Sequence, residues 1–465
     1  MSHAPAADER SSAPAPSLRN TLVTRQGHLV MAMLVVELLA GMQIYINQTV
    51  LPLLATELHA RSHYGLVTAA AQVPTFLTMP LGGAMLARWR ADRLMTALTA
   101  LLVAGAVLGA LAPGIEVYVA GEILRGLAAG ALATVSMGVL VAGLPDAWRR
   151  LFLAVGSATW VVSSLLGPAY AATISELYGW RWALVAYIPL LIGARLVMSR
   201  EIRGLRVGQE EGATAPWPAA LALAGGVGAI GVLPAASPWF WPGCAVGVAA
   251  ALWACARVFP PGTLRLAPGR RAGIATLAWV CTAYLALDYL VAPAAHDVLG
   301  LDAGMIGWAL TTAGVAWSVV AMWSGSRPAR APGRYMRRIR LGAVCFVVGG
   351  LVMAAAFHGQ APWWCLHVGF TLAGAGMGLT HQDTIIRCVS QPPAEGDRAG
   401  DGISEARSAT SVTIASAAGA ATLGTLAAAF VAPTDLGVEQ DRLVGIVLVL
   451  VVLLAVTPLL ARRAA

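Results

Sequence analysis

Long apolar stretches separated by short polar segments dominate the chain after residue 27. Fourteen such stretches can be drawn, at about 29–56, 64–87, 94–112, 115–143, 151–175, 180–199, 218–235, 239–257, 272–295, 304–324, 340–358, 362–387, 405–432 and 442–461. A helix that crosses the hydrocarbon core of a bilayer needs roughly 20 apolar residues. The stretches are too long and too uniformly apolar for the alternating strands of a barrel. The pattern therefore predicts an all-α polytopic membrane protein.

Composition supports this class. Of the 465 residues, 58% are hydrophobic and only 12% are charged, whereas about a quarter of a soluble domain is charged. The formal charge of +8 is better explained by loop arginines that set membrane topology than by binding of nucleic acid. We therefore expect no nucleic-acid partner.

The arginines predict how the chain is oriented. With the N-terminus inside and the spans alternating, 27 of the 31 basic residues, all of them arginines, fall on the inner side. Only Arg61, Arg181 and Arg442 fall outside, and Arg125 lies within the membrane. This bias follows the positive-inside rule. It predicts a multi-pass protein of the cell membrane with both termini cytoplasmic.

The spans fall into two groups of six with a distinct pair between them. Residues 1–27 are polar and rich in Ala, Pro and Ser, and are expected to form a disordered cytoplasmic tail. Residues 28–200 form an N-terminal six-helix half, and 272–465 form a C-terminal six-helix half. Residues 201–271 form a two-helix linker with flanking cytoplasmic loops, because the stretch from Trp217 to Ala256 holds no Asp, Glu, Lys, Arg or His. The alternative is a twelve-span chain with this stretch in or along the membrane.

The two halves resemble each other weakly. The fourth span of each half carries glycines four residues apart, Gly126 with Gly130 and Gly374 with Gly378, which allows helix backbones to approach closely. Paired repeats are typical of secondary transporters. The sequence contains no GxxxxGK[ST] loop for nucleotide binding. A gradient would therefore drive any transport.

Three stretches resemble motifs of the major facilitator superfamily, specifically its 14-span drug:proton antiporters. LLGPAYAATISELYGWRWALVAYIPL (165–190) resembles the antiporter motif of the fifth helix, GEILRGLAAG (121–130) the RxxxG motif, and LGGAMLARWRADRLM (81–95) the first inner-loop motif. The matching residues are Gly167, Pro168, Arg125, Gly82, Gly83 and Arg88. The resemblance implies a 6+2+6 arrangement of two pseudo-symmetric halves. It also implies proton-coupled export of a small, drug-like organic molecule by alternating access.

Other functions remain open at this point. The same scaffold would serve a proton symporter that imports a metabolite, or a lipid or glycolipid flippase. An enzyme would need a nucleophile with its base or a metal cluster near one membrane face, and no such constellation stands out. We expect no cofactor and no bound metal. The expected partners are the substrate, protons and the lipid bilayer, and the protein is expected to be a monomer.

Charged residues within apolar spans are costly and usually serve function. Glu122 and Arg125 are three residues apart and share a helical face, so they form either a static ion pair or a switch that protonation of Glu122 opens. Asp288 has no basic residue within a turn of its helix. It is the best candidate for a proton carrier, unless a partner across the bundle, for which Arg125 is the candidate, holds it ionised.

Further polar residues complete the predicted site. Glu37 and Asp383 are additional candidates for proton coupling, although either is also explained as ordinary polarity near the membrane interface. The predicted substrate-binding residues are Gln43, Asn47, Gln72 and Trp160. For Gln43 and Asn47, which lie one turn apart, the alternative is hydrogen bonding between helices.

Overall fold

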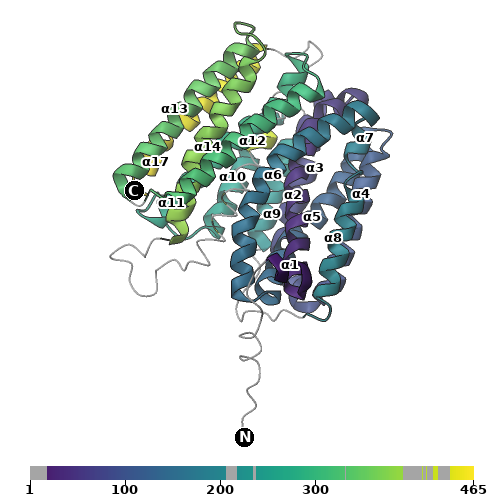
Figure 1. Ribbon diagram of the computed structural model, residues 1–465. Helices are drawn as coiled ribbons and strands as arrows, with labels where there is room; N and C mark the ends of the chain where they lie inside the picture. The colour runs from purple at the N-terminus through teal and green to yellow at the C-terminus, as the bar shows by residue number, and fades with distance from the viewer. Residues whose placement is uncertain are drawn as a thin grey trace.

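The computed structural model of the chain describes residues 18–205, 217–233, 237–329, 331–390, 411, 415, 423–427 and 440–465. The helices are α1 (Leu18–Val23), α2 (Arg25–Glu57), α3 (Tyr64–Arg88), α4 (Ala91–Ala110), α5 (Ile115–Gly143), α6 (Asp146–Tyr178), α7 (Trp180–Ala183), α8 (Ile188–Glu201), α9 (Trp217–Val232), α10 (Phe240–Val258), α11 (Arg270–Asp297), α12 (Ala303–Ser326), α13 (Pro332–Phe357), α14 (Cys365–Ser390), α16 (Gln440–Ala455) and α17 (Thr457–Ala461), with a short 3₁₀ turn at Arg61–His63. Figure 1 shows them as a bundle of long helices.

The helices confirm the all-α membrane class. Nine of the helices in the described part of the chain are long and apolar enough to cross a membrane. Every predicted span coincides with a helix or a pair of consecutive helices except 405–432. That span lies mostly outside the described residues, as does the predicted tail at 1–27 apart from its last ten residues. The division of the chain into 6+2+6 stays a prediction.

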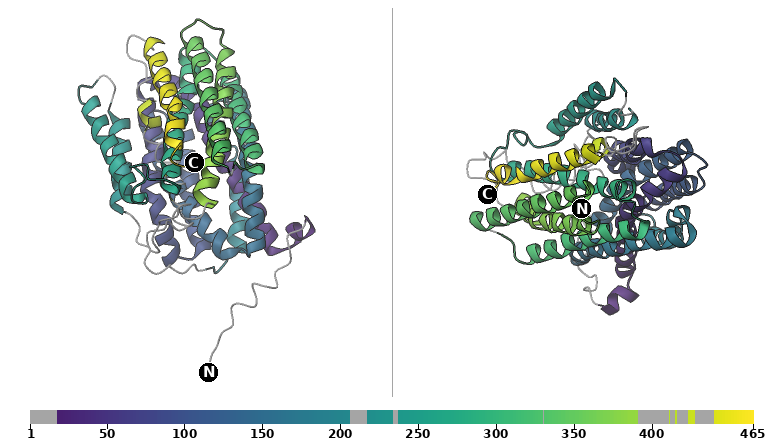
Figure 2. Two further views of the ribbon diagram at one scale, coloured as in Figure 1. Left: turned by 90° about the vertical axis from the view of Figure 1, so that its left-hand side faces the viewer. Right: turned by 90° about the horizontal axis from the view of Figure 1, so that it is seen from above.

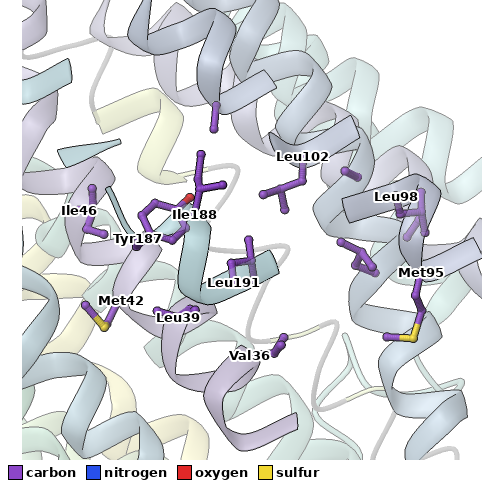
Figure 3. Packing of buried hydrophobic residues seen from close by; sticks show 14 of the residues in the cluster. Val36, Leu39, Met42, Ile46, Met95, Leu98, Leu102, Tyr187, Ile188 and Leu191 are labelled. Atoms are coloured by element: carbon purple, nitrogen blue, oxygen red, sulfur yellow. The ribbon is translucent and has the colours of Figure 1, made fainter. Parts of the chain in front are cut away.

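The core of the N-terminal half is a continuous set of buried aliphatic side chains. Figure 3 shows α2, α4 and α8 contributing to it, with Val36 and Leu39 on α2, Leu98 and Leu102 on α4, and Leu191 on α8. Burying such side chains stabilises by about 1.5–3 kcal/mol each relative to leaving them in water. Within a bilayer this gain is smaller, because lipid tails are also apolar, so close packing carries more of the stability.

Glycines set the close approach of α3 to α5. A Cβ added at Gly126 would lie 2.5 Å from the carbonyl oxygen of Ala71, and one at Gly82 would lie 2.6 Å from that of Ala131. A Cβ at Gly130 would clash with the Thr75 carbonyl. Thr78 Oγ1 adds a hydrogen bond of 2.9 Å to the Leu127 carbonyl across the same interface.

The C-terminal half has the same kind of close, glycine-mediated helix contact between α12 and α14. A Cβ at Gly374 would clash with the Ala313 carbonyl, and one at Gly378 would lie 2.6 Å from the Trp317 carbonyl oxygen. The small residues predicted to bring helices together therefore do so in both halves. The weak repeat in the sequence corresponds to a repeated packing of the second helix of each half against the fourth.

The Gly167–Pro168 stretch lies where the two halves meet. A Cβ at Gly167 would lie 2.9 Å from Cβ of Tyr45 on α2, and one at Gly307 of α12 would lie 3.1 Å from the Pro168 carbonyl oxygen. The α12 helix crosses α6 here, and the two helices diverge toward the lower part of Figure 1. The stretch therefore contacts an element of each half.

The pair α9 and α10 forms a separate hairpin at the edge of the bundle, as Figure 2 shows. Its two helices approach closely at Gly226 and Gly247, where a Cβ on either would lie 2.6 Å from the carbonyl oxygen of the other. The hairpin packs against α3 of the N-terminal half through a small apolar cluster that includes Val227 and Phe76.

Candidate functional site

Glu122 and Arg125 form a buried ion pair on α5. Their residues are only 3% and 4% exposed, and Arg125 Nη1 donates to Glu122 Oε1. The i, i+3 spacing allows this contact on one helix face. The predicted pairing is therefore confirmed, and whether the pair opens during function stays a prediction.

Arg125 also binds acceptors on α2. Its Nη2 donates to Asn47 Oδ1 at 3.2 Å. The Gln43 side-chain amide is oriented so that its oxygen faces these donors. Gln43 Oε1 then accepts from Arg125 and, at 3.0 Å, from the Tyr187 hydroxyl. The guanidinium is thus surrounded by one carboxylate and two amide oxygens. Gln43 and Asn47, predicted as substrate ligands, both accept hydrogen bonds from Arg125 in this structure.

Asp288 lies on α11 and accepts a hydrogen bond from Gln48 of α2. The suggestion that Arg125 is its partner is wrong, because Arg125 is held by residues of α5 and α2. The hydrogen bond crosses from one half to the other. Gln48 is 5% exposed, and its Oε1 has no hydrogen-bond partner. Asp288 forms no ion pair with any residue that the structure describes, in agreement with its isolation on its own helix.

A cavity of about 110 Å³ lies beside these groups. Its polar lining comes from α2, α3, α5 and α11, and consists of Asn47, Gln48, Thr68, Gln72, Tyr118, Glu122 and Tyr289. Gln72 Nε2 donates to the Tyr289 hydroxyl at 2.7 Å, which is a second hydrogen bond between the halves. The cavity thus brings Glu122 together with two of the four predicted substrate ligands, Asn47 and Gln72.

Trp160 and Glu37 form a separate contact. Trp160 Nε1 donates to Glu37 Oε1 at 3.0 Å, and Trp160 is 42% exposed. Neither residue lines the cavity. The structure therefore links these two predicted residues to each other and separates them from the polar cluster around Arg125.

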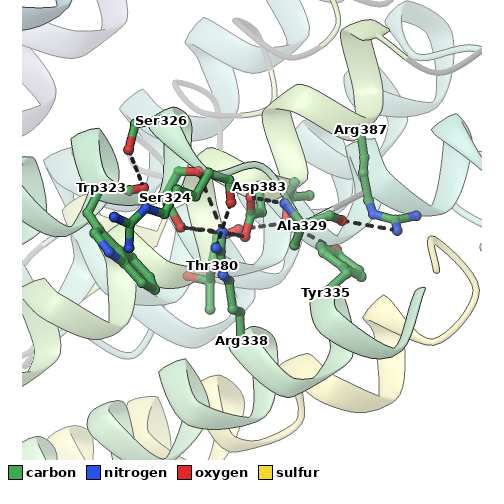
Figure 4. Close-up of polar contacts among 11 residues, drawn as sticks. Trp323, Ser324, Ser326, Ala329, Tyr335, Arg338, Thr380, Asp383 and Arg387 are labelled. Carbon is green, nitrogen blue, oxygen red and sulfur yellow. Dashed lines mark hydrogen bonds and ion pairs between the residues drawn. The ribbon is translucent and has the colours of Figure 1, made fainter. Parts of the chain in front are cut away.

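Asp383 is held by a buried network in the C-terminal half (Figure 4). Its Oδ2 lies 2.7 Å from Arg338 Nη1, and its Oδ1 accepts from the backbone N–H of Ala329 at 3.2 Å. Arg338 also donates to the Arg327 carbonyl at 2.6 Å and stacks over Trp323. The network ties the loop after α12 to α13 and α14. A role of Asp383 in proton coupling stays a prediction.

The inner-loop motif is only partly described. Arg88 is exposed at the end of α3, and the surroundings of Gly83 lie outside the described residues. Arg90 pairs with Asp92 at 2.9 Å within the same turn. The acid of this stretch is thus paired locally.

Five polar residues of the cavity lining and of the surroundings of Arg125 were not predicted from the sequence: Gln48, Thr68, Tyr118, Tyr187 and Tyr289. Gln48 and Tyr289 directly follow Asn47 and Asp288, which is the one signal that could have drawn attention to them. Within the described part of the chain, no group of three His, Cys, Asp or Glu side chains could hold a metal ion.

Comparison with known sequences identifies the family. The model of the Major Facilitator Superfamily matches residues 33–420. The fatty acid resistance protein FarB of Neisseria gonorrhoeae is 33% identical over 146 residues, which is 31% of this chain and 29% of FarB. The multidrug export protein EmrB of Haemophilus influenzae is 27% identical over 184 residues, 38% of this chain and 36% of EmrB. The matches thus span about a third of these relatives.

Comparison with solved structures supports the same fold. A POT family peptide transporter in an autoinhibited state gives a TM-score of 0.62 at 15% identity, with 94% of this chain and 97% of that chain covered. The xylose transporter XylE of Escherichia coli gives a TM-score of 0.59 at 14% identity with the same coverage. The family model covers most of the chain, and the helices have the fold of these transporters. The chain therefore belongs to the major facilitator superfamily.

Proposed function

We propose that this protein exports a small organic molecule in exchange for protons by alternating access. The observation that carries the proposal is the Asp288 carboxylate, which lies partly buried between the two halves and has an amide, rather than a cation, as its partner. A buried carboxylate without a cation is costly to keep charged. Binding a proton removes that cost, so Asp288 is the residue best suited to carry one.

The Gln48–Asp288 hydrogen bond would link this proton to the movement of the halves. A carboxylate accepts a stronger hydrogen bond than a neutral carboxylic acid. Loss of the proton therefore favours the contact of α2 with α11, and gain of the proton weakens it. The two halves would separate more easily at this level when Asp288 is neutral.

The other contacts between the halves support a proposal for which end of the bundle is closed. In the described ranges, the polar contacts between residues 28–200 and 272–465 begin at Gln48–Asp288 and Gln72–Tyr289. They continue to the first residue of α3 and the last residue of α11. There Tyr64 donates to Asp297 at 2.8 Å, and Arg61 lies 3.7 Å from the same carboxylate. In the proposed mechanism these contacts close the end of the bundle that the predicted topology places outside.

The Arg125 cluster is proposed as the second coupling element. Glu122 lines the cavity, and Arg125 holds Glu122 together with the two amides of α2. Protonation of Glu122 would release part of the Arg125 guanidinium to Gln43 and Asn47 and reshape the cavity wall. Conversely, a substrate that displaces Asn47 from Arg125 would return the guanidinium to Glu122 and favour loss of the Glu122 proton.

The export direction and the substrate class rest on the relatives and on the charge of the site. Relatives in the superfamily are named for multidrug export and for fatty acid resistance. Asp288 leaves one unbalanced negative charge near the cavity, since Glu122 is neutralised by Arg125. This favours a lipophilic cation or zwitterion over a fatty acid anion.

Proton flux in proteoliposomes tests the proposal. Protein would be reconstituted with a trapped pH-sensitive dye and challenged with ethidium, tetraphenylphosphonium and oleate, for the wild type, Asp288→Asn and the exposed-carboxylate control Asp441→Asn. We expect a cation to drive proton flux in the wild type and the control, and at least tenfold less flux in Asp288→Asn. Equal flux in Asp288→Asn would contradict the assignment of Asp288.

A further inference from the structure

A groove on the lipid-facing surface of the N-terminal half lies between α4 and α8, away from the central cavity. Its volume is about 390 Å³, and its lining consists of Thr96, Thr99, Ala100, Val103, Ala104, Ile192, Arg195, Leu196 and Ser199. Leu196 is 49% exposed and Ile192 38%, so these walls face the lipid of the membrane. Figure 1 shows α4 and α8 together at one edge of the bundle. The groove shares no lining residue with the central cavity.

Arg195 is the one charged residue among the described residues that line this groove. Its residue is 8% exposed, and its Nη1 donates to Ser136 Oγ at 3.3 Å. Its buried Nε–H has no acceptor. Among the residues that the structure describes, Arg195 forms no ion pair. Glu37 is the acid that attracts Arg195, but the two do not form an ion pair. The Glu37 carboxylate instead accepts a hydrogen bond from Trp160.

A buried guanidinium with an unused donor needs an anion more than any other ligand. Leaving a charge unpaired away from water is costly, and charged side chains within membranes normally pair or reach a polar region. The walls of the groove are apolar at Ala100, Val103 and Ala104 and can hold a hydrocarbon chain. At one end of the groove the Thr96 and Ser199 hydroxyls lie 3.3 Å apart. The Thr96 hydroxyl donates to the Asp92 carbonyl at 2.8 Å, so the Ser199 hydroxyl is the one that can donate to a phosphate oxygen.

We propose that this groove binds an anionic phospholipid of the surrounding bilayer. Arg195 would neutralise the phosphate, the Ser199 hydroxyl would donate to one of its oxygens, and one acyl chain would lie between α4 and α8. A membrane lipid fits better than a transported molecule because the groove opens onto the bilayer and is separate from the cavity. The bound lipid would join α4 to α8 and stabilise the N-terminal half as a rigid body.

Native mass spectrometry of the full chain in detergent tests this site. Dioleoyl phosphatidylglycerol, dioleoyl phosphatidylcholine and oleate would be added in turn to the wild type, Arg195→Met and Arg200→Met. Arg200 is exposed on the same helix, so its variant matches the change in charge without touching the groove. We expect phosphatidylglycerol adducts on the wild type and on Arg200→Met, at least tenfold fewer on Arg195→Met, and few phosphatidylcholine adducts on any of them.

A second variant keeps the test decisive if Arg195→Met does not fold. Ala100→Phe fills the groove from its exposed wall and leaves Arg195 in place. It should lose phosphatidylglycerol adducts to the same extent while unfolding at the wild-type temperature in the absence of lipid. Equal retention of phosphatidylglycerol by the wild type and Ala100→Phe would overturn the proposal. Retention of oleate without phosphatidylglycerol would also overturn it, by showing a fatty-acid site instead.

Discussion

Gln48 of α2 donates a hydrogen bond to the Asp288 carboxylate of α11, across the boundary between the two halves of the chain. In the proposed mechanism, this contact joins the group that carries a proton to a residue of the half that moves against it. It therefore predicts that the stability and the coupling of the protein respond differently to changes at position 288.

Asp288→Asn should leave stability nearly unchanged, because the Asn carbonyl oxygen still accepts from Gln48. Asp288→Leu removes the acceptor and leaves the buried Gln48 amide without a partner, which costs about 1–3 kcal/mol. Thermal unfolding of the purified variants in detergent would measure the difference. A loss of stability in Asp288→Asn as large as that in Asp288→Leu would show that the charge itself holds the halves together.

The Glu122–Arg125 pair gives a prediction about charge balance. Arg125→Met leaves Glu122 buried and unpaired, and should cost about 3–5 kcal/mol. Glu122→Gln should cost less, because Arg125 keeps the oxygens of Gln43 and Asn47 and gains the new amide oxygen.

The double variant Glu122→Gln with Arg125→Met removes both charges and should recover most of the stability without recovering transport. Expression level and unfolding temperature would measure the recovery of stability, and substrate efflux would measure the recovery of transport. Recovery of efflux in the double variant would show that the pair serves only the fold.

The glycines between α12 and α14 predict a steric effect. Gly374→Ala places a methyl group against the Ala313 carbonyl, and overpacking of this kind costs about 1–3 kcal/mol. The matched control is Gly445→Ala in α16, where an added Cβ meets nothing within 4 Å. The control should be neutral or slightly stabilising, because alanine favours helix. Similar unfolding temperatures for the two variants would contradict the close approach of α12 and α14.

In the proposed mechanism, the contact of Tyr64 with Asp297 holds the outer end closed. Tyr64→Phe removes the 2.8 Å hydrogen bond between the halves and should shift the population toward the outward-open state. Hydrogen exchange followed by mass spectrometry should show faster exchange at residues 59–66 and 296–302. Tyr178→Phe, a change at an exposed tyrosine of the same end, is the control. Unchanged exchange in Tyr64→Phe would show that other contacts hold this end.

Much of the fold could be predicted from the sequence because the bilayer leaves few choices. Length and apolarity determine the spans, and glycine spacing indicated the contacts at Gly126 and Gly374. The ion pair of Glu122 with Arg125 could be predicted because both lie on one turn of a single helix. Contacts between distant segments could not, since spacing along one helix does not indicate which face meets another helix. For that reason Gln48 was missed, and Trp160 was placed with residues it does not contact.

The most direct test separates coupling from binding at Asp288. A cation that the wild type transports would be followed in proteoliposomes in two ways: uphill transport driven by a pH gradient, and exchange of labelled for unlabelled compound without a gradient. We predict that Asp288→Asn loses uphill transport and retains exchange, because the amide, like the protonated acid, still accepts a weaker hydrogen bond from Gln48 but cannot bind and release a proton. Uphill transport at the wild-type rate in Asp288→Asn would contradict this mechanism.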